Sequence, residues 1–245
     1  MEWNIIHIAE TDSTNRWLKE RAAGEDCIVV ADYQTAGRGQ GDNRWESERG
    51  KNLLFSLLIH PLHVPANRQF RISMAVSLAI VEALSRHIGD VSIKWPNDIY
   101  WRNGKIAGIL IEHTLQGAMI RDSIIGVGLN VNQRQFRSDA PNPVSIWQIC
   151  EQETDRSQLL QEILHSFCRL MPPADAAGVE SPSGQALKAR YLSLLYRRRG
   201  FHPYADHTGP FMAELLDVED DGHLLLRDDG GRVRRYAFKE VLFVM

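Results

Sequence analysis

Glycine and arginine alternate within residues 33–45, and this spacing suits the binding of an anion. The segment reads Tyr-Gln-Thr-Ala-Gly-Arg-Gly-Gln-Gly-Asp-Asn-Arg-Trp, with a glycine at every second position from Gly37 to Gly41. Glycine lets a backbone approach a ligand closely, and the guanidinium of Arg38 carries a permanent charge with donors that match phosphate or carboxylate. The segment is interpreted either as a lid that orders over an anion or as a solvated surface loop, since glycine-rich patterns alone are weak signals.

A second group of cations comes later in the chain. Residues 91–95 predict a strand that contains Lys94, and a turn sequence with Asn97 and Asp98 follows it. Asn103-Gly104 then predicts a tight hairpin. Its second strand, residues 105–112, begins with Lys105 and is otherwise too apolar for a solvated edge. Lys105 is either a satisfied surface cation or, together with Lys94, part of a site for an anion.

Small polar residues precede the predicted helix 16–23. Ser13, Thr14 and Asn15 have side chains that cap the free N–H groups of a helix N-terminus. The same groups can also bind a polar ligand there. Both interpretations stay open from these residues alone.

Further along, a glycine pattern marks one face of a strand. Residues 123–132 predict a strand in which Gly126, Gly128 and Asn130 lie on the same face, because side chains alternate. That face has room for a ligand or for a packed neighbour at the two glycines. Gly108, inside the strand 105–112, likewise indicates a group that passes close to the backbone.

These elements must be positioned by a scaffold that mixes strands and helices. Apolar runs predict buried strands, helical spacing with a following glycine or proline predicts helix ends, and Asp-Gly turns divide short strands near the C-terminus. Gly89 is expected to end one helix, Thr154 or Asp155 to begin another, and Pro172-Pro173 to end that one at Met171. The predicted strands are 3–8, 27–31, 53–60, 99–102, 211–217, 223–227, 232–238 and 241–244; the predicted helices are 66–88, 154–171 and 185–197, with a loop at 174–184.

Composition excludes several classes of protein. The 245 residues are 44% hydrophobic and 24% charged with a net charge of −3, which indicates a globular protein without a basic field for nucleic acid. The three cysteines have no metal-type or disulfide-type spacing, which fits a reducing, cytoplasmic compartment. No apolar run reaches the length of a membrane span. His60 and His63 lack further ligands at a suitable spacing, so a metal site there is disfavoured.

Five motifs in order carry a resemblance to a known family. They are Ser13-Thr14-Asn15, Gln34 with Gly37-Arg38-Gly39 and Trp45, Lys94-Trp95-Pro96-Asn97-Asp98, Lys105-x-Ala-Gly-Ile-Leu-Ile-Glu, and Gly126-x-Gly-x-Asn130-x-Asn132. Over residues 3–135 the chain resembles the biotin–protein ligases, also called biotin–[acetyl-CoA-carboxylase] ligases. The resemblance implies an α+β fold, with a mixed central β-sheet flanked by helices (class II synthetase/biotin ligase-like) at 1–197 and a small SH3-like β-barrel at 198–245.

The resemblance also implies a reaction. Biotin and ATP, the latter with Mg²⁺, are the implied substrates, with no prosthetic group; biotinyl-5′-adenylate forms and the biotinyl group passes to a lysine of a biotin carboxyl carrier protein. The implied catalytic residues are Lys105, Arg38 and Lys94. The implied biotin-binding residues are Ser13, Thr14, Asn15, Gln34, Gly37, Arg38, Gly39, Gln40, Lys105 and Gly108. The implied ATP-binding residues are Arg38, Trp45, Lys94, Asn97, Asp98 and Asn130. No metal ligand is assigned firmly, and Asp98 is the nearest candidate for the Mg²⁺.

The chain departs from the family pattern in the glycine-rich segment. Better-known bacterial members read Gly-Arg-Gly-Arg-Arg-Gly, whereas Gln40 stands here in place of an arginine and Asp42 adds a negative charge. Retention of the adenylate is therefore in question. Arg232, Arg234 and Arg235 are interpreted either as contacts to nucleotide or carrier or, preferably, as a solvated strand face.

Two other functions stay open. A lipoate–protein ligase shares the fold and the adenylate chemistry, but it needs an apolar pocket rather than the polar groups at 13–15 and Gln34. A non-catalytic biotin or adenylate sensor is disfavoured by the presence of both Lys94 and Lys105. Because the chain starts within a few residues of the catalytic fold, no DNA-binding domain and no operator binding are expected.

Overall fold

A seven-stranded mixed sheet forms the larger part of the molecule. The computed structural model describes residues 3–21, 24–41, 43–61, 63–138, 142–171 and 184–244. The strand order is β1-β2-β3-β7-β6-β5-β4, and within it only β1 and β2 are parallel. The strands are β1 (Asn4–Ile8), β2 (Cys27–Ala31), β3 (Leu53–Ile59), β4 (Val91–Lys94), β5 (Asp98–Trp101), β6 (Gly104–Gln116) and β7 (Met119–Leu129).

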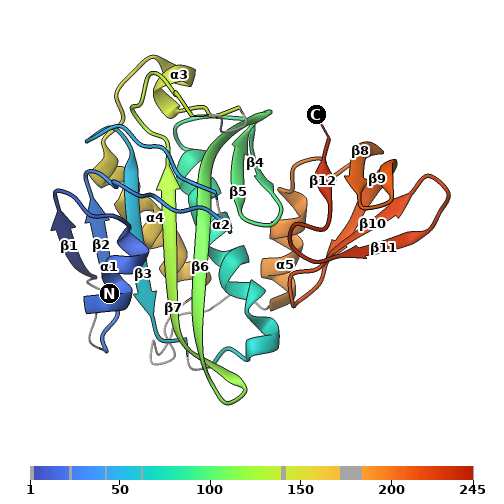
Figure 1. The fold of residues 1–245 in the computed structure, drawn as a ribbon, viewed down its shortest axis with the longest axis horizontal. Coiled ribbons are helices and arrows are strands. Elements are labelled where there is room, and N and C mark those ends of the chain that lie inside the picture. The colour runs from blue at the N-terminus through green and yellow to red at the C-terminus, as the bar shows by residue number, and fades with distance from the viewer. Residues whose placement is uncertain are drawn as a thin grey trace.

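Helices cover both faces of this sheet, so its central strands are buried (Figure 1). Strands β2 and β3 are buried at every position, which explains their continuous apolar sequences. On one face, α1 (Thr14–Arg21) places Leu18 against Cys27, Val29 and Leu58. On the other face lie α2 (Phe70–Leu84), α4 (Arg156–Leu170) and α5 (Gly184–Ser193), while α3 (Ile146–Cys150) follows a capping box at Ser145.

A second, antiparallel sheet lies beside the edge formed by β4 and β5 (Figure 1). Its order is β11-β10-β9-β8-β12. The strands are β8 (His202–Asp206), β9 (Gly209–Val218), β10 (Leu224–Asp228), β11 (Val233–Tyr236) and β12 (Leu242–Phe243). The predicted fold class is confirmed: a mixed sheet flanked by helices and a small C-terminal β-structure. Within the described residues, the second sheet does not pair β11 with β12, so the expected barrel is an open sheet here. The division at residue 197 stays a prediction.

Several predicted boundaries are wrong: the last helix ends at Ser193 rather than at residue 197, and β7 is Met119–Leu129 rather than 123–132. Two further differences lie at turns. Helix α2 ends at Leu84, not at Gly89: beyond it the backbone forms tighter turns, in which Arg86 N–H donates to the Ala83 carbonyl at 3.2 Å and His87 N–H to the Leu84 carbonyl at 2.9 Å. The hairpin between β5 and β6 turns at Arg102-Asn103, with Arg102 in the left-handed region at φ 49°, so Gly104 is already the first residue of β6. The turn is thus one residue earlier than the Asn-Gly signal predicts.

Strand β8 was not predicted, and its sequence explains why. It reads His-Pro-Tyr-Ala-Asp, and proline disfavours a strand interior. Pro203 is tolerated in β8, where only Tyr204 is fully buried. The predicted helix end at Pro172-Pro173 and all but residue 184 of the predicted loop at 174–184 lie outside the described residues. Among the described helices, none combines the length and the apolar character that a membrane crossing requires.

Candidate active site

A cavity of about 370 Å³ opens between the glycine-rich segment, strands β6 and β7, and the second sheet. Five of the sequence motifs contribute to its lining. The lining residues are Ser13, Thr14, Asn15, Gln34, Arg38, Gly39, Gln40, Asn43, Arg44, Trp45, Lys94, Trp95, Pro96, Asn97, Asp98, Lys105, Gly108, Ile109, Leu110, Gly126, Val127, Gly128, Lys239, Val241, Leu242 and Phe243.

One end of the cavity carries amides and hydroxyls, and we call it the amide end (Ser13, Thr14, Asn15, Gln34 and Ser56). The backbone N–H of Thr14 donates to the Gln34 side-chain carbonyl at 2.8 Å, and the Thr14 hydroxyl donates to the same oxygen at 3.1 Å. Ser56 Oγ lies 2.7 Å from both Thr14 Oγ1 and Asn15 Oδ1. The amide of Asn15 donates to the Leu110 carbonyl at 3.2 Å, so this end is already connected to β6.

Ser56 and Glu112 are members of this network that sequence reasoning missed. Ser56 is the polar residue within the apolar strand β3 and is fully buried, which is the signal that identifies it. Glu112, at the end of the Lys105 motif, accepts a hydrogen bond from Asn15 at 3.1 Å and pairs with Arg38 at 3.8 Å. The position of Asn15 therefore depends on two side chains outside its own motif.

The glycines of the central strands make room for packed neighbours. A Cβ on Gly126 would overlap the Asn15 amide, and a Cβ on Gly128 would overlap the Trp45 indole. A Cβ on Gly108 would lie 3.0 Å from the same indole. Of the two alternatives left open by the sequence, the structure shows packed side chains at these three glycines, and those side chains line the cavity.

The glycine-rich segment folds into a short hairpin above these strands. Gly39 N–H donates to the Asn43 carbonyl at 2.7 Å, and Trp45 N–H donates to the Gly37 carbonyl at 2.9 Å. Arg38 and Arg44 face each other across it as an antiparallel bridge. Gly37 lines an adjoining hollow rather than the main cavity. Asp42, the unexpected acid in this segment, lies outside the described residues.

The charged side chains of the cavity form its cationic end (Lys94, Asp98, Lys105 and Lys239), whereas Arg38 lies nearer the amide end, because its partner Glu112 also accepts a hydrogen bond from Asn15. Lys105 Nζ lies 2.7 Å from Asp98 Oδ1, and it also lies 5.6 Å from the centre of the Trp45 ring. Lys94 Nζ donates to the Tyr100 hydroxyl at 2.9 Å and lies above the Tyr100 and Phe243 rings. Burial lowers the pKa of Lys94, the negative charge of Asp98 opposes this shift, and the positive charge of Lys105 adds to it.

Asp98 is the carboxylate of the cationic end, whereas the neighbouring Asn97 forms hydrogen bonds with the backbone of β6. Asn97 donates from its amide to the Ile109 carbonyl at 2.7 Å and accepts the Ile109 N–H on its own carbonyl at 2.9 Å. Asp98 is the candidate ligand for the Mg²⁺ of a nucleotide, since carboxylates with water suit this ion. Its pairing with Lys105 must loosen when it takes that role.

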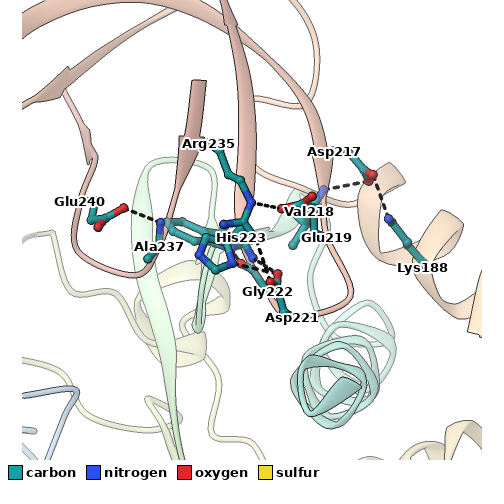
Figure 2. Close-up of polar contacts among 11 residues, drawn as sticks. Lys188, Asp217, Val218, Glu219, Asp221, Gly222, His223, Arg235, Ala237 and Glu240 are labelled. Atoms are coloured by element: carbon teal, nitrogen blue, oxygen red, sulfur yellow. Dashed lines mark hydrogen bonds and ion pairs between the residues drawn. The ribbon is translucent and has the colours of Figure 1, made fainter. Parts of the chain in front are cut away.

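Other predicted site residues lie elsewhere. Asn130 is buried outside the cavity lining, and its amide donates to the Val144 carbonyl at 3.1 Å. Arg234 pairs with Asp206 and Asp228, and Arg235 pairs with Glu219 and Asp221, so both arginines are engaged within the second sheet. The Arg235 cluster appears in Figure 2. These pairs explain the two arginines without a nucleotide or a carrier.

His60 also pairs with neighbouring carboxylates. Its Nδ1 lies 2.7 Å from Asp26 Oδ1, and its Nε2 lies 3.6 Å from Asp122 Oδ1. The absence of a metal site at His60 and His63 stays a prediction.

Comparison with known proteins agrees with this fold. Residues 8–130 match the model of the biotin/lipoate A/B protein ligase family. The chain is 30% identical to the biotin–[acetyl-CoA-carboxylase] ligase of Paracoccus denitrificans over 92% of its own length and 95% of the relative's. It is 30% identical to the enzyme of the same name from Mycobacterium tuberculosis, covering 92% and 83% of the two chains. A solved biotin protein ligase from Aquifex aeolicus, in complex with biotin and ATP, superposes with a TM-score of 0.75 at 25% identity, covering 98% of this chain and 97% of that one.

The mixed sheet, its flanking helices and the cavity above β6 and β7 thus define an adenylate-forming type of ligase domain. The chain belongs to the biotin/lipoate A/B protein ligase family.

Proposed function

We propose that this protein activates biotin with ATP and transfers it to a lysine of a biotin carboxyl carrier protein of acetyl-CoA carboxylase. The observation that carries the proposal is one cavity with an amide end and a cationic end. Biotin has a neutral, polar ureido ring at one end and a carboxylate at the other. The ureido ring therefore suits the amide end, and the carboxylate suits the cationic end. ATP supplies a second anion at the cationic end.

Biotin recognition is assigned to the amide end. Ser13, Thr14, Asn15 and Gln34 offer both donors and acceptors to the ureido group, while Gly108 lines the cavity near Trp45 and Lys105. The first three are at most 4% exposed, so their polar groups act in a partly dry site where hydrogen bonds discriminate strongly. A site built for such bonds rejects an analogue that lacks them by roughly 10⁴–10⁵-fold.

The adenylation step is assigned to the cationic end. The biotin carboxylate attacks the α-phosphorus of ATP, the bond to the β-phosphate oxygen breaks, and pyrophosphate leaves. Lys105, Arg38 and Lys94 neutralise the charge that two anions bring together, and such preorganised charge is a principal source of catalysis. We assign the backbone of Gly39 and Gln40 to the same phosphates, and Trp45, Asn97 and Asp98 to the nucleotide and its Mg²⁺, because all five residues line the cavity. Asn130 contributes to this site indirectly, because its amide donates to the backbone carbonyls of Lys105 and Val144.

The transfer step uses the carrier as the nucleophile. The neutral amine of a carrier lysine attacks the acyl carbon of the mixed anhydride, an amide bond forms, AMP leaves with the electron pair, and the amine gives up a proton. The free cysteines Cys27, Cys150 and Cys168 fit the reducing, cytoplasmic location that we propose. We also propose that the chain does not bind operator DNA, in keeping with its net charge of −3; a salt-dependent footprint on an operator would contradict this.

Biotin-dependent exchange of pyrophosphate into ATP tests the proposal, with lipoate as the parallel substrate. We expect exchange with biotin and none with lipoate, followed by transfer to a purified carrier domain. Exchange with lipoate alone would assign the chain to the sister branch of the family. No exchange with either compound, together with tight binding of biotin, would favour a sensor without catalytic activity.

A further inference from the structure

One cation of the cavity comes from the second sheet. Lys239 lies in the connection between β11 and β12, outside every motif that relates the chain to its family, yet it lines the cavity. Val241, Leu242 and Phe243 line the cavity from the same connection and from β12. The second sheet therefore completes one wall of the site, and Lys239 is the charged residue of that wall.

The turn that carries Lys239 is held in a defined position. The Glu240 carboxylate accepts the backbone N–H of Ala237 at 2.7 Å, as Figure 2 shows. The Phe238 ring packs against Trp95 and Phe70 with centroid distances of 5.4 Å and 6.0 Å. Lys239 itself adopts the left-handed region at φ 70°, which is unfavourable for a lysine and is found where the surroundings fix the backbone.

A neighbouring turn anchors the same part of the second sheet to the larger one. The Trp95 indole N–H donates to the Gly222 carbonyl at 2.9 Å, and Trp95 directly follows Lys94. Arg235 donates to Glu219 and Asp221, which both belong to that turn (Figure 2). The turn 237–240 is thus held in a fixed position beside the Lys94–Asp98 motif.

The ammonium of Lys239 points at the glycine-rich segment. A Cβ on Gly41 would overlap Lys239 Nζ. Gly41 also has a φ of 66°, so both the close contact and the backbone conformation favour glycine at this position. Lys239 Nζ has no hydrogen bond or ion pair with any residue that the structure describes. In contrast, Lys105 is paired with Asp98, and Arg38 with Glu112.

We propose that Lys239 binds the phosphates of ATP and supplies the positive charge that Gln40 does not bring to the glycine-rich segment. This inference deepens the proposed function and rests on it. A cation that has no partner among the described residues, on a fixed turn at the wall of the cavity, requires little reorganisation when an anion enters. Charge-assisted hydrogen bonds to phosphate are among the strong ones, so the nucleotide gains affinity from a residue outside the loop.

The test compares purified full-length variants in biotin-dependent ATP–pyrophosphate exchange. Lys239→Asn removes the charge and keeps a residue that tolerates positive φ. We expect the KM for ATP to rise roughly tenfold, as for the loss of one charged hydrogen bond, with the KM for biotin unchanged. Lys239→Arg should restore most of the loss. Lys188→Gln is the control, because Lys188 pairs with Asp217 in the same part of the molecule but outside the cavity (Figure 2).

Compensation by Gln40 is tested in a double variant. If Lys239 replaces the charge absent at Gln40, then Gln40→Arg in the Lys239→Asn background lowers the KM for ATP again. An unchanged KM for ATP in Lys239→Asn would overturn the proposal. It would also be overturned if Asp42→Asn raised that KM as much as Lys239→Asn, because Lys239 would then serve only as a partner for the loop's own acid.

Failure of the proposed function can be told apart from failure of this inference. If the wild-type chain shows no exchange with biotin, calorimetric binding of Mg·ATP to the wild-type, Lys239→Asn and Lys188→Gln proteins still measures the role of Lys239. Weaker binding by Lys239→Asn alone supports the phosphate contact. Equal binding by all three proteins refutes it.

Discussion

The two ends of the cavity differ in how completely their polar groups are already paired. At the amide end, Thr14, Asn15 and Ser56 are buried and bonded to one another on rigid elements. At the cationic end, the charges come from strands β4, β5 and β6 and from the turn of the second sheet that carries Lys239, and Lys105 is bonded to the carboxylate that we assign to the nucleotide's metal. From this comparison we expect the site for the neutral group to be preformed in the fold, and the charged end to reorganise when ATP binds.

Lys105→Met should produce the largest effect, because it removes the cation nearest the reacting groups. Loss of one preorganised donor costs about 10²–10³-fold in rate, so we expect a fall of that order in biotin-dependent exchange. Since the substitution also leaves Asp98 unpaired, Lys105→Met with Asp98→Asn separates the loss of charge from a folding defect. A double variant with normal melting temperature and normal exchange would show that the cationic end lies elsewhere.

Gly126→Ala tests the rigidity of the amide end. The added methyl group would overlap the Asn15 amide, which is fixed by Ser56 and by the Leu110 carbonyl. Overpacking of this kind costs roughly 1–3 kcal/mol. We therefore expect the KM for biotin to rise roughly tenfold and the KM for ATP to change little. Gly89→Ala is the matched control, because no atom lies within 4 Å of a Cβ built there. An equal rise in both KM values would mean that the two ends are not independent.

Much of the scaffold could be predicted because its signals are local. The continuous apolar runs of β2 and β3 and the Asp155 cap of α4 each depend on neighbouring residues alone. Strand β8 could not be predicted, since Pro203 is tolerated only because of where the sheet places it. The end of α2 was wrong because the chain changes to tighter turns at residues 86–88 without a glycine or proline to signal the change.

The candidate site was predictable where motifs carry it and not where distant segments meet. Residues 13–15, Gln34, Lys94 and Lys105 line one cavity, and their roles stay predictions. Ser56 and Lys239 contribute through contacts across 42 and roughly 200 positions of the chain, which no spacing pattern records. The pairing of Arg234 and Arg235 with acids of the second sheet was invisible for the same reason.

Trp95→Phe sharpens the comparison at the junction of the two sheets. The variant keeps an aromatic ring against Phe238 but loses the hydrogen bond to the buried Gly222 carbonyl. We expect the free energy of unfolding to fall by about 1 kcal/mol, more if that carbonyl stays unsatisfied, and the KM for ATP to rise with the KM for biotin unchanged. Denaturant unfolding and exchange kinetics measure the two effects. If the KM for biotin changed instead, the second sheet would serve the amide end.

The smallest expected effect is a pH dependence confined to the cationic end. Because burial lowers the pKa of Lys94, its ammonium loses its proton at a lower pH than an ordinary lysine does. Below that lowered pKa, the positive charge of Lys94 is present and attracts ATP. As the pH rises through the pKa, this attraction is lost. The energetic cost of burying the charge is lost with it. A unit charge pair at 4 Å in water is worth about 1 kcal/mol, or about fivefold in affinity, so the KM for ATP should rise by that order toward alkaline pH. Lys94→Met should remove this rise and leave the pH profile of the KM for biotin as it is, and the same slope in both proteins would assign the titration to another group.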